Sequence, residues 1–154
     1  PGFTEVAVAS SLASATAMEF SPTGQLWVLE QAGRVKLVRN DATTHTALTM
    51  SVDSRGERGL LGIAFAPSYD GVGSNPDSVY LYHTLPGGSN NRITRYEVMN
   101  AGTTTPTFVN PVTILDLDGL SAATNHNGGA IHFGPDGLLY VAVGDNANGA
   151  NAQS

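Results

Sequence analysis

Short apolar runs separated by turn residues dominate the chain. In residues 34–38, Val35 and Leu37 alternate with Arg34 and Lys36, which is the period of a strand with one buried face. The apolar run at residues 60–66 is far shorter than the ~20 residues that a membrane-spanning helix needs. Eighteen glycines and eight prolines indicate tight turns between such runs. The pattern therefore predicts an all-β protein of short strands, with no membrane insertion.

One hairpin pattern occurs three times along the chain. Residues 20–28 recur as residues 133–141, each with a Phe, a Pro-containing turn and a strand of aromatic and aliphatic residues. A third copy starts at Phe65 and has a longer turn. Strand, turn and strand form the inner part of a propeller blade, and residues 34–38 and 92–98 are candidate outer strands.

The repeats favour a partial β-propeller over residues 1–154. We expect about three four-stranded blades, at roughly 1–45, 46–110 and 111–154, of which the last is incomplete. The alternative is an independent β-sandwich with similar hairpins. Part of a ring would leave blade faces uncovered, so we expect a second chain, self-association or further residues to supply the remainder of the propeller.

Charge and cysteine content narrow the function. Seven Lys and Arg stand against 13 Asp and Glu, giving a net charge of −6. A protein with this balance has no electrostatic footprint for nucleic acid. There is no cysteine, which excludes a disulfide or a thiolate site within the chain.

Two polar segments could carry chemistry. Glu57 precedes Phe65 at nearly the same distance as His126 precedes Phe133, so both stand at the same point of their blades. Loops on one face of a propeller surround the central channel, where such side chains converge.

His126 and Asp145 are the candidate acid/base pair. A strand out and a strand back separate them, so they return to the same end of the blade. A carboxylate beside an imidazole fixes its tautomer and raises its basicity. The alternative is a His that caps a turn and an Asp that binds nearby backbone amides.

These segments resemble the soluble quinoprotein sugar dehydrogenase family, the glucose/sorbosone and aldose sugar dehydrogenases. The matching positions are residues 59–65, 126–129, 133–137, Tyr140 and 144–145. The resemblance implies a six-bladed propeller of which this chain is the N-terminal half. It also implies pyrroloquinoline quinone (PQQ) and calcium as cofactors, an aldose or related alcohol as substrate, and a secreted or periplasmic location.

The resemblance also implies roles for individual residues. His126 aligns with the base that takes the proton of the sugar C1 hydroxyl while hydride passes to the quinone, and Asp145 aligns with the carboxylate that orients it. No metal ligand is assigned within this chain. The candidate cofactor-binding residues are Glu57, Arg58, Asn125 and Asn127.

Two departures from the family keep other functions open. Ala130 stands where family enzymes commonly carry Arg, and Glu57 replaces a common Gln, which opposes a tricarboxylated cofactor electrostatically. Both favour a non-catalytic ligand-binding propeller, like the related domain of hedgehog-interacting proteins. A metal-dependent lactonase or hydrolase is the third interpretation, because Glu57, Asn125, His126 and Asp145 carry oxygen and nitrogen donors.

Overall fold

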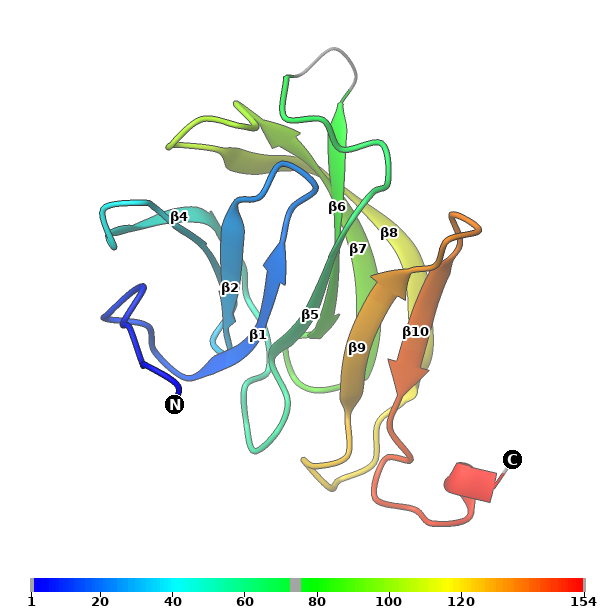
Figure 1. Ribbon diagram of the computed structural model, residues 1–154. Coiled ribbons are helices and arrows are strands. Elements are labelled where there is room, and N and C mark those ends of the chain that lie inside the picture. Colours follow the sequence, from blue (N-terminus) through cyan, green and yellow to red (C-terminus); the bar gives the residue numbers. More distant parts are fainter. Residues whose placement is uncertain (1, 73–75, 154) are drawn as a thin grey trace.

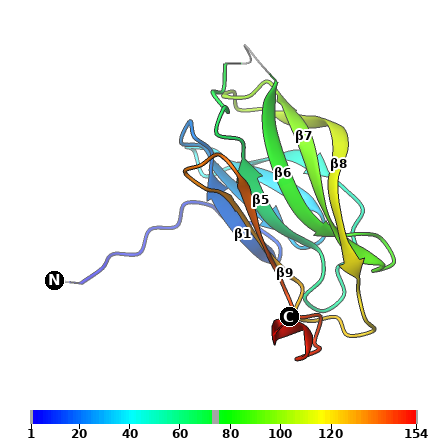
Figure 2. The same ribbon diagram turned by 90° about the vertical axis from the view of Figure 1, so that its right-hand side faces the viewer.

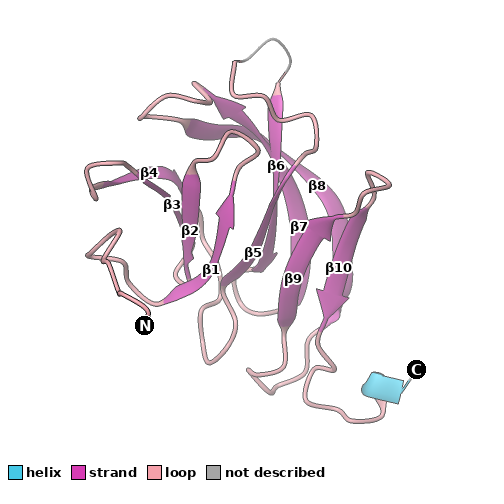
Figure 3. Ribbon diagram, viewed as in Figure 1, coloured by secondary structure: helices cyan, strands magenta, loops and turns pink. Residues whose placement is uncertain are grey.

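The computed structural model describes residues 2–72 and 76–153, and within them it contains strands and one short helix (Figures 1 and 3). The tip of the long turn after Phe65, at residues 73–75, lies outside the described residues. No helix in the described part is long and apolar enough to cross a membrane. The elements are β1 (Ala15–Phe20), β2 (Leu26–Glu30), β3 (Arg34–Val38), β4 (Thr44–Thr49), β5 (Leu60–Phe65), β6 (Asp77–Thr84), β7 (Asn90–Met99), β8 (Thr107–Gly119), β9 (Gly128–Phe133), β10 (Leu139–Val143) and η1 (Asn151–Gln153).

The strands form three antiparallel sheets that follow one another along the chain. The first sheet has the order β1-β2-β3-β4, the second β5-β6-β7-β8, and the third is the pair β9-β10. The first strands of the three sheets, β1, β5 and β9, lie side by side (Figures 1 and 2). This is the arrangement of propeller blades whose first strands face a common centre.

The strands expected to be outermost in the first two sheets are in fact third in order. β3 and β7 each pair on both sides, and β4 and β8 form the outer edges. The alternation in β3 therefore reflects two sheet faces and not a water-facing edge. The sheets also extend past the expected divisions near residues 45 and 110, because β4 ends at Thr49 and β8 at Gly119.

The repeated hairpin has the same local structure at both ends of the chain. The Gly24 amide donates to the Ser21 carbonyl at 2.8 Å, and the Gly137 amide donates to the Gly134 carbonyl at 2.9 Å. Both turns end on a glycine with positive φ, 82° and 77°, which an L side chain would strain. The recurring letters therefore encode a recurring turn.

Two apolar cores join the three sheets. Between the first and second sheets, the Trp27 ring lies 5.7 Å from the Phe65 ring and 5.2 Å from the Phe108 ring, centroid to centroid. Tyr82 and Ile131 belong to the smaller core between the second and third sheets. Large aromatic side chains therefore serve packing between blades.

The inner strands β5 and β9 come unusually close because of glycine. A Cβ placed on Gly62 would lie 1.9 Å from the Gly129 carbonyl oxygen. Only the missing side chain permits this approach. It brings the loop that precedes β5 next to the loop that precedes β9, and these loops carry the predicted site residues.

Candidate active site

His126 and Asp145 meet as the sequence predicts. His126 lies in the loop before β9 and Asp145 directly follows β10, and the antiparallel pair returns the chain to the same end. His126 Nδ1 lies 2.7 Å from Asp145 Oδ1. The side chains are 53% and 22% exposed, so the pair is open to a ligand.

The pairing determines which ring nitrogen of His126 is available. The Asp145 carboxylate accepts a hydrogen bond from Nδ1–H, and this leaves the lone pair on Nε2 in the neutral ring. Nε2 makes no hydrogen bond to the described residues. The arrangement can therefore accept a proton from a bound molecule.

Glu57 connects the two loops. Its Oε2 accepts a hydrogen bond of 2.7 Å from the backbone amide of His126. Its own amide donates to the Thr124 carbonyl at 2.8 Å. In this structure Glu57 braces the backbone of His126, and its contact with a cofactor stays a prediction.

The backbone of His126 is held in an unfavourable conformation. Its φ of 59° lies in the left-handed region, which costs a non-glycine residue roughly 1–2 kcal/mol. The Asn146 amide donates to the His126 carbonyl at 3.3 Å. A Cβ on Gly144 would lie 1.8 Å from the same carbonyl oxygen, so only glycine fits there.

Arg58 links the loop before β5 to the loop before β9 through hydrogen bonds of its buried side chain. It is 3% exposed, and its Nη1 donates to Asp53 Oδ2 at 2.9 Å. Its Nη2 donates to the carbonyls of Ser121 and Ala123 at 2.7 and 3.0 Å. Because Nη1 and Nη2 donate to other residues of the chain, Arg58 has a structural role here. Its role in cofactor binding remains a prediction.

Asp53 is the anchor for both neighbouring arginines, and sequence reasoning missed it. Arg55 adds two hydrogen bonds of 2.8 Å to its carboxylate. These bonds from Arg55, and then the bond from Arg58, outweigh burial and hold the pKa of Asp53 well below its usual range. A lone Asp in a loop gives no sequence signal for such a cluster.

The two predicted asparagines differ in exposure. Asn127 is 3% exposed, and its Nδ2 donates to the Thr124 carbonyl at 3.2 Å, while its Oδ1 is buried without a partner. Asn125 is exposed, and its side chain hydrogen-bonds to none of the described residues. Asn125 is thus free to meet a ligand, whereas Asn127 faces the interior.

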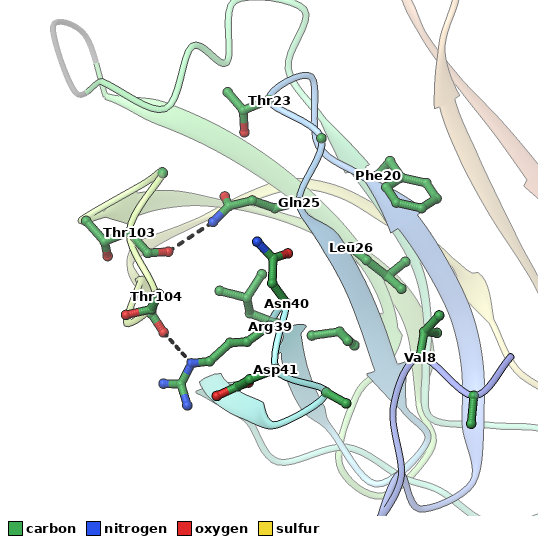
Figure 4. Close-up of a pocket in the computed structure, with 16 residues that line it drawn as sticks. Val8, Phe20, Thr23, Gln25, Leu26, Arg39, Asn40, Asp41, Thr103 and Thr104 are labelled. Carbon is green, nitrogen blue, oxygen red and sulfur yellow. Dashed lines mark hydrogen bonds between the residues drawn. The ribbon is translucent and has the colours of Figure 1, made fainter.

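A separate cavity of about 890 Å³ lies at the opposite ends of the strands (Figure 4). Gln25 Nε2 donates to the Thr103 carbonyl there at 2.9 Å, and Arg39 Nε donates to the Thr104 carbonyl at 3.0 Å. None of the predicted site residues lines it. In residues 2–72 and 76–153, no group of three or more His, Asp or Glu side chains could hold a metal ion.

Comparison with known proteins places the chain in a family. Residues 12–154 match the model of the glucose/sorbosone dehydrogenase family. The chain belongs to this family. It is 27% identical over 153 residues to quinoprotein glucose dehydrogenase B of Acinetobacter calcoaceticus, covering 93% of the chain and 31% of that protein. It is also 28% identical over 135 residues to the mouse hedgehog-interacting protein, covering 79% of the chain and 19% of that protein.

The fold agrees with this membership. The PQQ-bound aldose sugar dehydrogenase from Streptomyces coelicolor superposes with a TM-score of 0.81 and 30% identity, covering 97% of this chain and 43% of that one. The expected all-β partial propeller is therefore confirmed. The chain spans less than half the length of each of these relatives.

Proposed function

We propose that this chain is part of a quinone-dependent sugar dehydrogenase propeller that oxidises an aldose or related alcohol, with His126 as general base. The observation that carries the proposal is the His126 Nδ1 to Asp145 Oδ1 pair at 2.7 Å, open to solvent, in a chain of this family. A base with one nitrogen oriented and the other free is what proton removal from a hydroxyl requires.

The residues of this chain account for the proton half of the reaction. His126 Nε2 takes the proton of the C1 hydroxyl, and Asp145 stabilises the imidazolium that forms. The Glu57 carboxylate accepts a hydrogen bond from the His126 amide and so holds the His126 backbone in place. PQQ, when bound, would supply the acceptor for the hydride that leaves C1.

The donor set fits one part of a PQQ site. His126 and Asn125 are exposed and can contact the substrate. Glu57 and Asp145 add negative charge to the site. The Arg58 guanidinium does not offset this charge toward a ligand, because it is hydrogen-bonded in the interior. Cations that balance the carboxylates of PQQ, and the ligands of calcium, therefore belong to the remainder of the propeller. We also propose that the protein is secreted or periplasmic.

Reconstitution of the complete protein tests this function. The protein is titrated with PQQ at each of several calcium concentrations, and reduction of PQQ is followed by absorbance after a panel of aldoses is added. We expect saturable PQQ binding and sugar-dependent reduction, while protein without PQQ stays inactive. Absence of PQQ binding at every calcium concentration would refute the dehydrogenase assignment.

Ala130 and Glu57 support a second candidate, a non-catalytic ligand-binding propeller. Neither residue supplies positive charge where a tricarboxylated cofactor would need it. The 28% identity to a hedgehog-interacting protein points the same way. In the titration above, this candidate predicts no PQQ binding by a well-folded protein.

A further inference from the structure

A network of buried hydrogen bonds lies next to His126. The carbonyl oxygen of Asn127, the next residue, accepts a hydrogen bond of 2.7 Å from the Tyr82 hydroxyl and one of 3.3 Å from Asn91 Nδ2. Tyr82 is fully buried and Asn91 is 2% exposed. Both belong to the second sheet, in β6 and β7, so the two bonds fasten the third blade's loop to its neighbour.

The same network also holds the loop that carries Glu57. Thr84 Oγ1 donates to Asn91 Oδ1 at 2.7 Å and accepts a hydrogen bond of 3.3 Å from the Gly59 amide. The Thr84 amide donates in turn to the Gly59 carbonyl at 2.8 Å. One buried network thus sets the places of both loops that meet at His126.

The network supports a residue with a strained backbone, His126. His126 has a φ of 59°, and without support its loop would relax toward a commoner conformation and rotate the ring away from Asp145. The bonds to the Asn127 carbonyl act one residue from the strained position. We propose that Tyr82 is a positioning residue, whose hydroxyl holds the His126 ring on Asp145 through the Asn127 carbonyl; this rests on the proposed role of His126 as base.

The chemistry of Tyr82 suits a permanent donor. Burial raises the pKa of its phenol to about 12, so the hydroxyl keeps its proton at any physiological pH. It does not reach the reacting atoms, because it points at a backbone carbonyl in the interior.

The test is Tyr82→Phe in the complete protein, with Tyr80→Phe as the matched control. Tyr80 lies on the same strand, and its hydroxyl bonds to none of the described residues. We expect Tyr82→Phe to lower kcat by about 10- to 100-fold with a much smaller change in KM. We also expect loss of the low-field NMR resonance of the His126 ring proton shared with Asp145, which Asp145→Asn identifies by removing it.

The readouts separate this proposal from the function on which it rests. If the wild type fails to oxidise sugars, the proposed function falls, and the ring-proton resonance of Tyr82→Phe still tests the positioning. A lower melting temperature with unchanged kcat and resonance would give Tyr82 a structural role only and overturn the proposal. If Tyr82→Phe does not fold, Asn91→Ala removes the longer bond to the same carbonyl together with the bond from Thr84 to Asn91 Oδ1; a loss of kcat and of the resonance supports the proposal, and an unchanged resonance overturns it.

Discussion

At the residue scale, carboxylates in this region have three distinct tasks. Asp145 orients an exposed imidazole, Glu57 accepts from a backbone amide, and the buried Asp53 binds one buried arginine, Arg58, and one exposed arginine, Arg55. The surroundings of each carboxylate, and not its residue type, separate these tasks. The exposed imidazole beside Asp145 remains available to a ligand, whereas Asp53 is buried and holds the buried Arg58 in the fold.

The low pKa of Asp53 makes stability depend on pH. Its carboxyl ordinarily titrates near 3.8, and in the folded chain the pKa is lower, so below about pH 4 the unfolded state binds more protons. The free energy of unfolding therefore falls as the pH drops through this range. We expect Asp53→Asn to be less stable at neutral pH and to lose less stability between pH 5 and pH 3.

Urea unfolding at several pH values measures this effect. The midpoints of wild type and Asp53→Asn are expected to approach each other as the pH falls. Midpoints that stay the same distance apart from pH 5 to pH 3 would show that Asp53 contributes no pH dependence.

At the scale of elements, the close contact of β5 and β9 connects fold to site. Gly62→Ala places a methyl group against the Gly129 carbonyl and is expected to destabilise the protein by about 1–3 kcal/mol. Gly149→Ala is the control, because its Cβ would meet no atom within 4 Å. Denaturant unfolding compares them, and equal stability of both variants would contradict this close packing.

The strands and the meeting of His126 with Asp145 could be predicted because they depend on local patterns. Alternation and repeated Pro-Gly turns mark the hairpins, and a strand out and back fixes the relation of His126 to Asp145. Strand order was predicted less well, since β3 alternates whether or not β4 lies beside it. The interior contacts of the Arg58 side chain and of the Asn127 carbonyl join segments that are distant in the sequence, and such contacts leave no mark on neighbouring residues.

At the scale of the whole molecule, both ends of the row of sheets expose apolar side chains. Met18 and Phe20 on β1 are 69% and 60% exposed, and Tyr140 and Val143 on β10 are each 57% exposed. Surfaces of this kind at the ends of a partial ring are suited to pack against further blades.

Residues 1–154 expressed alone are therefore expected to self-associate and to bind a hydrophobic dye, unlike the complete protein. Sedimentation velocity and dye fluorescence provide the measurement. A monodisperse monomer that binds no dye would mean that these faces need no partner.

The most direct test of the central claim is the single-turnover rate of sugar oxidation by the reconstituted complete protein carrying His126→Ala. The matched control is His132→Ala on β9, whose side chain is 69% exposed and away from Asp145. Loss of a general base predicts a rate at least about 100-fold lower for His126→Ala, with His132→Ala close to wild type. A His126→Ala protein that oxidises sugar as fast as wild type would contradict the account.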